Sequence, residues 1–267
     1  MHPIIALILG IVEGLTEYLP VSSTGHLILA GHLLGQSGPA VDAFDVVIQL
    51  GAVLAVVVHY RALLATRVRG LFAKDPAAVR LLVALVVAFV PTAIAGLLLR
   101  KTIKALLFGT LPVVCALVVG GVVMVIVERV RKAKKVEGLH GLENVTPKRA
   151  FIIGLGQIVS MWPGSSRSMC TIIAGQLTGL STATAAEFSF LLALPTLGAA
   201  TIYEGYKSRH DLAQTIGVPS LAIGLVVSFL VAWAVIAVFL RYLQRRGLEP
   251  FGYYRVVVGL AFLLLMR

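Results

Sequence analysis

Long apolar stretches separated by short polar ones set the strongest limit on how this chain can fold. The stretches 81–99, 111–127 and 220–240 are each long enough, at about 1.5 Å per residue, to cross a hydrocarbon core roughly 30 Å thick. Hydrophobic residues make up 58% of the 267 positions, more than a soluble domain of this size can bury in one core. We therefore expect an integral membrane protein.

The net charge of +11 does not indicate a nucleic-acid-binding protein, because the Lys and Arg residues sit in short loops between apolar stretches. Cys115 and Cys170 lie in apolar surroundings without metal-ligand spacing, so we interpret them as packing residues. The first apolar stretch is interrupted by Glu13 and Glu17 and does not resemble a cleaved signal peptide. With no long polar stretch to form a second unit, we predict one membrane domain over residues 1–267.

Three pairs of similar segments recur about 140 residues apart, which indicates an internal duplication with halves at 1–135 and 145–267. The longest pair is EGLTEYLPVSSTGHLILAG, from residue 13, and QIVSMWPGSSRSMCTIIAG, from residue 157. In this alignment the second copy is one residue shorter before its Pro-x-Ser-Ser core. The shared core is polar, so the similarity is more than a coincidence between apolar helices.

Each Pro-x-Ser-Ser block is flanked by apolar pieces too short to cross a membrane, such as 3–12 and 27–34, which predicts a re-entrant hairpin around a cavity. Each half then adds three full spans. Because three is odd, the second half enters from the opposite face, so the two hairpin tips meet near the midplane of an inverted-topology repeat. The predicted fold class is an all-α membrane protein with two re-entrant helical hairpins and about six transmembrane helices, at 43–60, 80–99, 111–128, 184–203, 217–240 and 252–266.

The distribution of Lys and Arg over the predicted loops indicates which face of the protein is cytoplasmic. The predicted loops 61–80, 128–149 and 241–251 share one face and contain 15 Lys and Arg residues, whereas the other face contains six. By the positive-inside rule the first face is cytoplasmic, so both termini and the mouth of the first hairpin face outward.

Glu13 and Glu17 lie four residues apart, so on a helix both carboxylates project from one face. A charged carboxylate at the centre of a bilayer costs about 2.5 to 3.5 kcal/mol on insertion scales, and a binding partner has to offset that cost. Two carboxylates leave room for phosphate oxygens and water around a hard cation, so we expect a divalent cation, Mg²⁺ or Ca²⁺. A buried carboxyl pair that shares one proton is the alternative.

The block in the first half continues into Thr24 and His26. Pro20 breaks the preceding helix, and the hydroxyl groups of Ser22 and Ser23 suit the amino-terminal cap of the next one. His26 follows Ser23 by three residues, so the two side chains can lie side by side on one turn, as a hydroxyl nucleophile and its general base require. Helix capping, with a histidine that only satisfies hydrogen bonds, is the structural alternative.

The block in the second half combines glycine, hydroxyl groups and a permanent positive charge. A helix that follows such a block directs free N–H groups and its positive dipole end toward an anion. The planar guanidinium of Arg167 fits phosphate oxygens, and an ion pair with Glu13 or Glu17 is a compatible second role. The residues that we expect to bind a diphosphate are Gly164, Ser165, Ser166, Arg167, Ser168 and Thr171, together with Ser22 and Thr24 from the first block.

Carboxylates for a metal, a hydroxyl beside a base and a cationic clamp, all inside a bilayer, fit phosphoryl transfer from a lipid. In such reactions positioning and the neutralisation of charge dominate over covalent machinery.

The stretches EGLTEYLPVSSTGH and PGSSRSMCT resemble the two signature regions of the bacterial undecaprenyl-diphosphatase family, which is associated with bacitracin resistance. The resemblance covers the whole chain, including the stretch AAEFSFLLALP. It implies hydrolysis of undecaprenyl diphosphate to the monophosphate, which recycles the carrier lipid of peptidoglycan synthesis. It also implies a divalent cation and an active site that opens to the outer face of the bacterial plasma membrane.

Position by position, the resemblance implies a role for each polar residue of the two blocks. The family's mechanism has been written either with a serine nucleophile or around a histidine, and the sequence does not decide between them. Met169 and Cys170 stand where members often have small residues such as Gly-Ala, which we expect to narrow the pocket. The implied assignments are Glu13 and Glu17 as the Glu-x-x-x-Glu pair, Ser23 as nucleophile, His26 as essential histidine, and Ser166, Arg167 and Thr171 in the second motif.

Two alternatives come from other kinds of protein. An inverted repeat with hairpins that meet at the midplane is also a transporter architecture, so the chain could be a flippase of an anionic lipid or a carrier of an ion. The pair of Ser23 and His26, which a carrier does not need, favours hydrolysis. A different family of membrane lipid phosphatases carries Ser-Arg-x5-His, and no histidine follows Arg167 at that spacing. The expected partners are a polyprenyl diphosphate lipid and the bilayer, with no nucleic acid, and the sequence leaves a homodimer open.

Overall fold

The computed structural model describes residues 1–107, 109–244 and 246–265, and this part of the chain is helical, without strands. Proline at the first helical turn and a side-chain or glycine cap begin several of the helices, as in α1, α3, α7 and α11. The helices are α1 (Pro3–Thr16), α2 (Ser23–Leu33), α3 (Pro39–His59), α4 (Arg61–Phe72), α5 (Pro76–Leu107), α6 (Thr110–Ala133), α7 (Pro147–Val159), α8 (Arg167–Leu177), α9 (Thr182–Lys207), α10 (Arg209–Asp211), α11 (Val218–Leu243) and α12 (Glu249–Leu265), with the short turns η1 (Leu142–Asn144) and η2 (Leu212–Ile216).

The chain is a multi-pass membrane protein. Within the described residues, α3, α5, α6, α9 and α11 are long and apolar enough to cross a membrane, so five of the predicted spans are confirmed. The sixth, predicted at 252–266, forms α12, whose 17 residues cover roughly 25 Å at about 1.5 Å per residue. Residue 266 lies outside the described part of the chain. The helix α5 also continues beyond its predicted end at residue 99.

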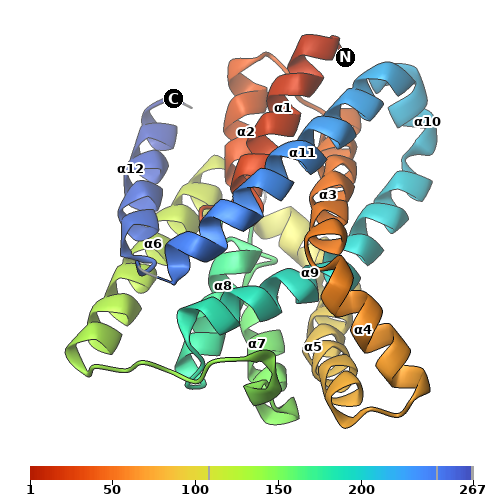
Figure 1. Ribbon diagram of the computed structural model, residues 1–267. Helices are drawn as coiled ribbons and strands as arrows, with labels where there is room; N and C mark the ends of the chain where they lie inside the picture. The colour runs from red at the N-terminus through yellow and green to blue at the C-terminus, as the bar shows by residue number, and fades with distance from the viewer. Residues whose placement is uncertain (108, 245, 266–267) are drawn as a thin grey trace.

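Two helical hairpins approach each other from opposite ends of the molecule (Figure 1). The upper hairpin consists of α1 and α2, and the lower one of α7 and α8. None of these four helices exceeds 14 residues, so none is long enough to cross the bilayer alone. This is the arrangement that the broken apolar segments predict, although α1 runs on to Thr16 instead of stopping at residue 12.

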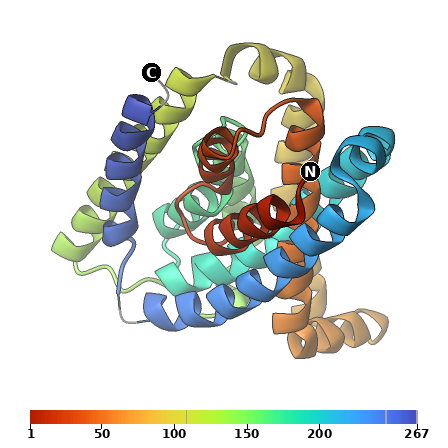
Figure 2. The ribbon, with the colours of Figure 1, turned by 90° about the horizontal axis from the view of Figure 1, so that it is seen from above.

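Seen from above, the upper hairpin is surrounded by longer helices (Figure 2). The helix α1 packs against α11 and α3, and α12 lies along α6 at one side of the molecule. Glycines bring α1 and α11 close together, because a Cβ atom added to Gly14 would lie 2.7 Å from the Cβ of Val231. Such close backbone approach is the usual source of packing between helices in lipid. Glu17, which caps the carboxyl end of α1 three residues after Gly14, is buried inside the protein.

The two hairpins of the repeat align without a gap. The first residues of α1 and α7, Pro3 and Pro147, and the capping residues of α2 and α8, Ser22 and Ser166, are all separated by 144 positions. The structure therefore corrects the alignment read from the Pro-x-Ser-Ser blocks, in which the second copy is one residue shorter. The corresponding serines are Ser22 and Ser166, because the cap that begins a helix, and not the letters around it, determines which residues are equivalent in space.

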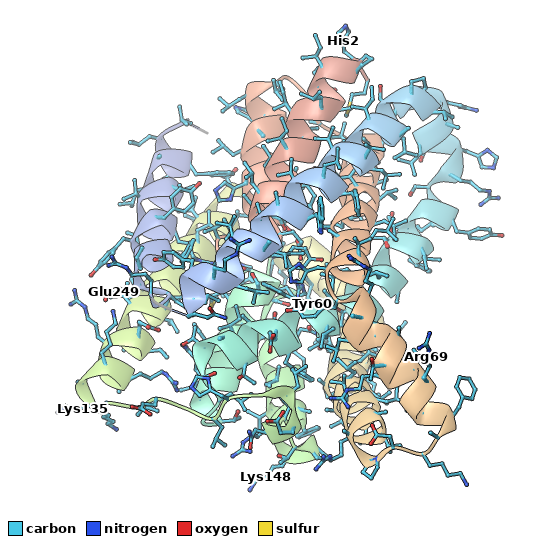
Figure 3. All side chains as sticks on the ribbon, in the orientation of Figure 1. His2, Tyr60, Arg69, Lys135, Lys148 and Glu249 are labelled. Atoms are coloured by element: carbon cyan, nitrogen blue, oxygen red, sulfur yellow. The ribbon has the colours of Figure 1, made fainter. Side chains whose placement is uncertain are left out.

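The basic loops gather at one end of the molecule. Arg69, Lys135 and Lys148 lie at the lower end, whereas His2 lies at the upper end (Figure 3). Both termini are at the upper end (Figure 1). The segments that follow α3 and α6 therefore share the lower end of the molecule, whereas Glu249, at the end of the loop after α11, lies near mid-height (Figure 3).

Candidate active site

The tips of the two hairpins meet through an ion pair. Arg167, the first residue of α8, donates from Nε and Nη2 to Oε1 of Glu17 at 3.2 and 3.1 Å. The side chains are 9% and 5% exposed, so the pair is almost fully removed from solvent. The ion pair considered as a second role for Arg167 is therefore present, and its partner is Glu17 rather than Glu13.

The second oxygen of Glu17 accepts a hydrogen bond from the hydroxyl of Ser23. The distance from Ser23 Oγ to Glu17 Oε2 is 2.6 Å, and both side chains are buried. One carboxylate thus touches the predicted nucleophile with one oxygen and the predicted phosphate-binding cation with the other. A carboxylate in this contact is placed to accept the hydroxyl proton.

Glu13 is fully buried, and neither of its carboxylate oxygens has a hydrogen-bond partner among the described residues. A buried polar group without a partner is costly, so such an atom in a native fold calls for an explanation. Glu13 and Glu17 do not play equivalent parts, because Glu17 is already engaged with Ser23 and Arg167.

The two ring nitrogens of His26 form hydrogen bonds with groups other than Ser23. Its Nδ1 lies 2.8 Å from the carbonyl oxygen of Ser22, and its Nε2 lies 2.8 Å from the hydroxyl of Tyr254 on α12. Because a carbonyl oxygen can only accept, Nδ1 carries the hydrogen, and Nε2 of the neutral ring accepts from Tyr254. The two rings are also stacked, with centroids 5.6 Å apart. The predicted role of His26 as the base for Ser23 stays a prediction, and in this arrangement it requires the ring to turn.

Several of the predicted hydroxyl groups in the two blocks make hydrogen bonds within the hairpin tips. Ser22 and Ser166 cap α2 and α8 from left-handed backbone conformations, with φ of 75° and 71°. Ser168 donates to the carbonyl oxygen of Leu19 in the first tip at 2.9 Å. Thr24 lies in the first turn of α2 and is half-buried. Of these contacts, the hydrogen bond from Ser168 to Leu19 joins the two tips, whereas the two caps stabilise the starts of their own helices. Thr171, one turn into α8, is bonded elsewhere.

Thr171 and Arg167 share a partner on α9 that the sequence analysis missed. The hydroxyls of Thr171 and Ser189 lie 2.6 Å apart, and Arg167 Nη1 donates to the Ser189 carbonyl oxygen at 2.9 Å. The guanidinium also lies over the ring of Tyr18, 5.8 Å from its centroid. Ser189 is fully buried and belongs to the stretch AAEFSFLLALP, where a polar residue in an apolar span was the available signal.

The remaining predicted residues, Gly164 and Ser165, contribute main-chain atoms. Both carbonyl oxygens accept hydrogen bonds from Arg255, at 2.9 and 3.0 Å. Gly164 has a φ of 95°, which disfavours any other residue at this turn. Arg255 and Tyr254 were not predicted either, although an arginine within an apolar span is itself a signal of function.

The side chains at the site could supply some of the ligands that a divalent cation needs. The two unpaired oxygens of Glu13 are hard ligands, next to a second carboxylate on Glu17. Among the described residues, no group of three or more His, Cys, Asp or Glu side chains is arranged to hold a metal ion. A cation bound here would take its other ligands from water and from substrate oxygens, as Mg²⁺ commonly does.

Comparison with known proteins gives a consistent result. The model of the family described as bacitracin resistance protein BacA matches residues 6–261. A protein of Sorangium cellulosum named undecaprenyl-diphosphatase is 57% identical over 255 residues, which cover 95% of this chain and 83% of the relative. Proteins of the same name from Deinococcus radiodurans and Aromatoleum aromaticum are 46% and 45% identical, over 98% and 97% of this chain and 94% and 93% of theirs.

Proposed function

The chain belongs to the bacitracin resistance protein BacA family, and from this we propose that it hydrolyses undecaprenyl diphosphate to undecaprenyl phosphate and inorganic phosphate. The observation that carries the proposal is the contact of Glu17 with both Ser23 and Arg167. A hydroxyl, a proton acceptor and a phosphate-binding cation are thereby brought together where the two hairpins meet. Recycling of the carrier lipid for peptidoglycan synthesis, and with it bacitracin resistance, would follow from this activity.

We propose that Ser23 attacks the terminal phosphorus atom. A bond forms between Ser23 Oγ and phosphorus, the bond from phosphorus to the bridging oxygen breaks, and undecaprenyl phosphate leaves. The hydroxyl proton passes to Glu17, since its carboxylate is the acceptor in contact with Ser23. Water then attacks the phosphoserine, the bond between phosphorus and Ser23 Oγ breaks, and inorganic phosphate leaves. Glu17 returns its proton to Ser23 Oγ and so restores the hydroxyl.

His26 fits the second of these steps better than the first. Its Nε2 is the ring nitrogen that carries no hydrogen, and it accepts a hydrogen bond from Tyr254 rather than from Ser23. We propose that His26 receives the proton of the attacking water once undecaprenyl phosphate has left. The scheme in which His26 deprotonates Ser23 directly is the competing proposal, and it requires the ring to leave Tyr254.

Binding of the diphosphate competes with the ion pair between Glu17 and Arg167. The guanidinium can exchange a carboxylate for phosphate oxygens without losing its contact with Ser189, because the two contacts use different nitrogen atoms. The amino-terminal end of α8 adds the positive end of its dipole. Ser166, Ser168 and Thr171 shape this end of the site, and Ser22 and Thr24 do so at the start of α2.

A divalent cation would be held by Glu13 and Glu17. When bound, it would neutralise charge on the diphosphate and supply a partner for the otherwise unpaired oxygens of Glu13.

We further propose that the protein resides in the bacterial plasma membrane, with the site opening outward. The first hairpin and both termini lie at the upper end of the molecule, opposite the basic loops around Lys135 and Lys148 (Figures 1 and 3). The positive-inside rule places such basic loops in the cytoplasm.

The test is release of inorganic phosphate from undecaprenyl diphosphate by purified protein in detergent with Mg²⁺ or Ca²⁺. Detergent removes the two compartments that a flippase needs, so the assay detects hydrolysis alone. We expect release by the wild type and its loss in Ser23→Ala and Arg167→Ala. Ser208→Ala and Arg209→Ala, at the upper end away from the hairpin tips, are the matched controls. A folded wild type that releases no phosphate would instead support the transporter alternative.

A further inference from the structure

Arg255 is a charged side chain in the interior of the molecule, and no carboxylate among the described residues pairs with it. It belongs to α12, and its side chain is 0% exposed. None of the ion pairs found among the described residues involves it. A buried cation is costly unless hydrogen bonds satisfy it, so its partners explain why it is tolerated.

Five main-chain carbonyl oxygens surround the guanidinium, and a guanidinium has five N–H groups to donate. The donors are Nε, Nη1 and Nη2, and the distances lie between 2.9 and 3.3 Å. The acceptors are the carbonyl oxygens of Pro20, Gly164, Ser165, Ala116 and Leu117.

These carbonyl groups come from three separate parts of the chain. Pro20 lies in the turn between α1 and α2, Gly164 and Ser165 lie in the turn between α7 and α8, and the other two belong to α6. Nη1 alone bridges the two turns, at 3.2 Å to Pro20 and 3.0 Å to Ser165. Arg255 therefore connects both hairpin tips to each other and to the α6 and α12 pair.

Glycines leave room for the Arg255 side chain and for the lower turn that it contacts. A Cβ atom at Gly120 of α6 would overlap the guanidinium, and one at Gly164 would overlap the carbonyl oxygen of Val113. Lysine could not replace the arginine, because its single nitrogen atom cannot reach carbonyl groups on opposite sides of a planar fork.

We propose that Arg255 is a positioning residue for the hydrolysis proposed above, on which this inference rests. Pro20 lies three residues before Ser23, and Ser165 lies two residues before Arg167. Holding those two carbonyl groups on one rigid fork fixes the separation between the nucleophile and the phosphate-binding cation. The residue does not touch the substrate and acts through the main chain of the tips.

The experiment compares Arg255→Gln with a matched control, Arg149→Gln, in the full-length protein. Arg149 also donates to main-chain carbonyl groups, those of Asn144 and Thr178, but at the lower end of the molecule. Both changes remove a guanidinium bonded to carbonyl oxygens. The measurements are kcat and KM per folded molecule, with the folded fraction taken from gel filtration and thermal unfolding.

We expect kcat of Arg255→Gln to fall about 100-fold, the effect that misplacement of reacting groups by about 1 Å can have, while KM changes far less. Arg149→Gln should lower thermal stability without changing kcat per folded molecule. A purely structural role for Arg255 predicts less folded protein with normal kcat, and that result would overturn the proposal. An inactive wild type would instead count against the proposed function.

Quenching of tryptophan fluorescence is a second measurement, and it reports on the tip of the lower hairpin. Trp162, in the turn of the lower hairpin, donates to the carbonyl oxygen of Pro112 at 3.0 Å, and Trp233 is the other tryptophan of the chain. In a Trp233→Phe background, Arg255→Gln should expose Trp162 more strongly to a water-soluble quencher. A low kcat with unchanged quenching would assign the effect to charge and overturn positioning.

Should Arg255→Gln fail to fold, Gly120→Ala decides the question. The added methyl group displaces the guanidinium without removing it. A kcat per folded molecule equal to that of the wild type would overturn the proposal, and a reduced kcat that Arg149→Gln does not share would support it.

Discussion

Arg167 and Glu17 lie 150 residues apart in the sequence and form an ion pair of 3.1 Å between Nη2 and Oε1. This contact joins the two halves of the repeat. The other oxygen of the same carboxylate accepts the hydrogen bond of Ser23, so three predicted residues depend on one another through a single side chain.

Replacing Glu17 with glutamine keeps the size of the side chain and removes its charge. We expect the rate of phosphate release to fall by about 100-fold or more, because a general base typically contributes that much. Glu249→Gln is a matched control, since Glu249 also pairs with cations, Arg129 and Lys132, but on the exposed surface. A Glu17→Gln protein with near-normal kcat would rule out Glu17 as the acceptor of the Ser23 proton.

Substitution of His26 separates the two proposed steps. With substrate labelled in its terminal phosphate and reactions stopped in acid, His26→Gln should accumulate label bound covalently to the protein. The label should be absent from Ser23→Ala and from the double variant. If His26→Gln forms no phosphoenzyme while Ser23 is intact, the first step depends on His26, and the competing scheme is correct.

Loss of Glu13 should weaken cation binding. Because its unpaired carboxylate is the ligand that Glu17 cannot replace, Glu13→Gln should require a higher Mg²⁺ concentration for half-maximal rate. Bound Mn²⁺, measured by electron paramagnetic resonance in the absence of substrate, should fall in parallel. Asp211→Asn, in α10 at the upper end, is the control and should bind as the wild type does. Equal Mn²⁺ binding by Glu13→Gln would remove Glu13 from the metal site.

Cysteine labelling tests the outward opening. The two natural cysteines are Cys115, which is exposed, and Cys170, which is buried, so the background variant is Cys115→Ser. In intact cells, an impermeant thiol reagent should label Lys207→Cys at the end of α9 and spare Lys134→Cys after α6. Labelling of Lys134→Cys alone would invert the proposed orientation.

Much of the fold followed from local patterns. The apolar stretches predicted the spans because length and hydropathy are properties of a segment, and the odd number of spans in each half predicted the opposed hairpins. The alignment of the halves was wrong by one residue, because similar letters around Ser165 and Ser166 do not reveal which serine caps α8.

The sequence by itself determined that this chain spans a membrane and that polar residues gather in two equivalent blocks, because the cost of placing charge and bare backbone in lipid leaves few alternatives. Only the tertiary structure decided which of these residues meet. The pairing of Ser23 with Glu17, the orientation of His26 toward Tyr254 and the carbonyl groups around Arg255 all join parts of the chain by packing. Such contacts depend on distances of a few ångströms between separate helices, which spacing along one helix does not encode.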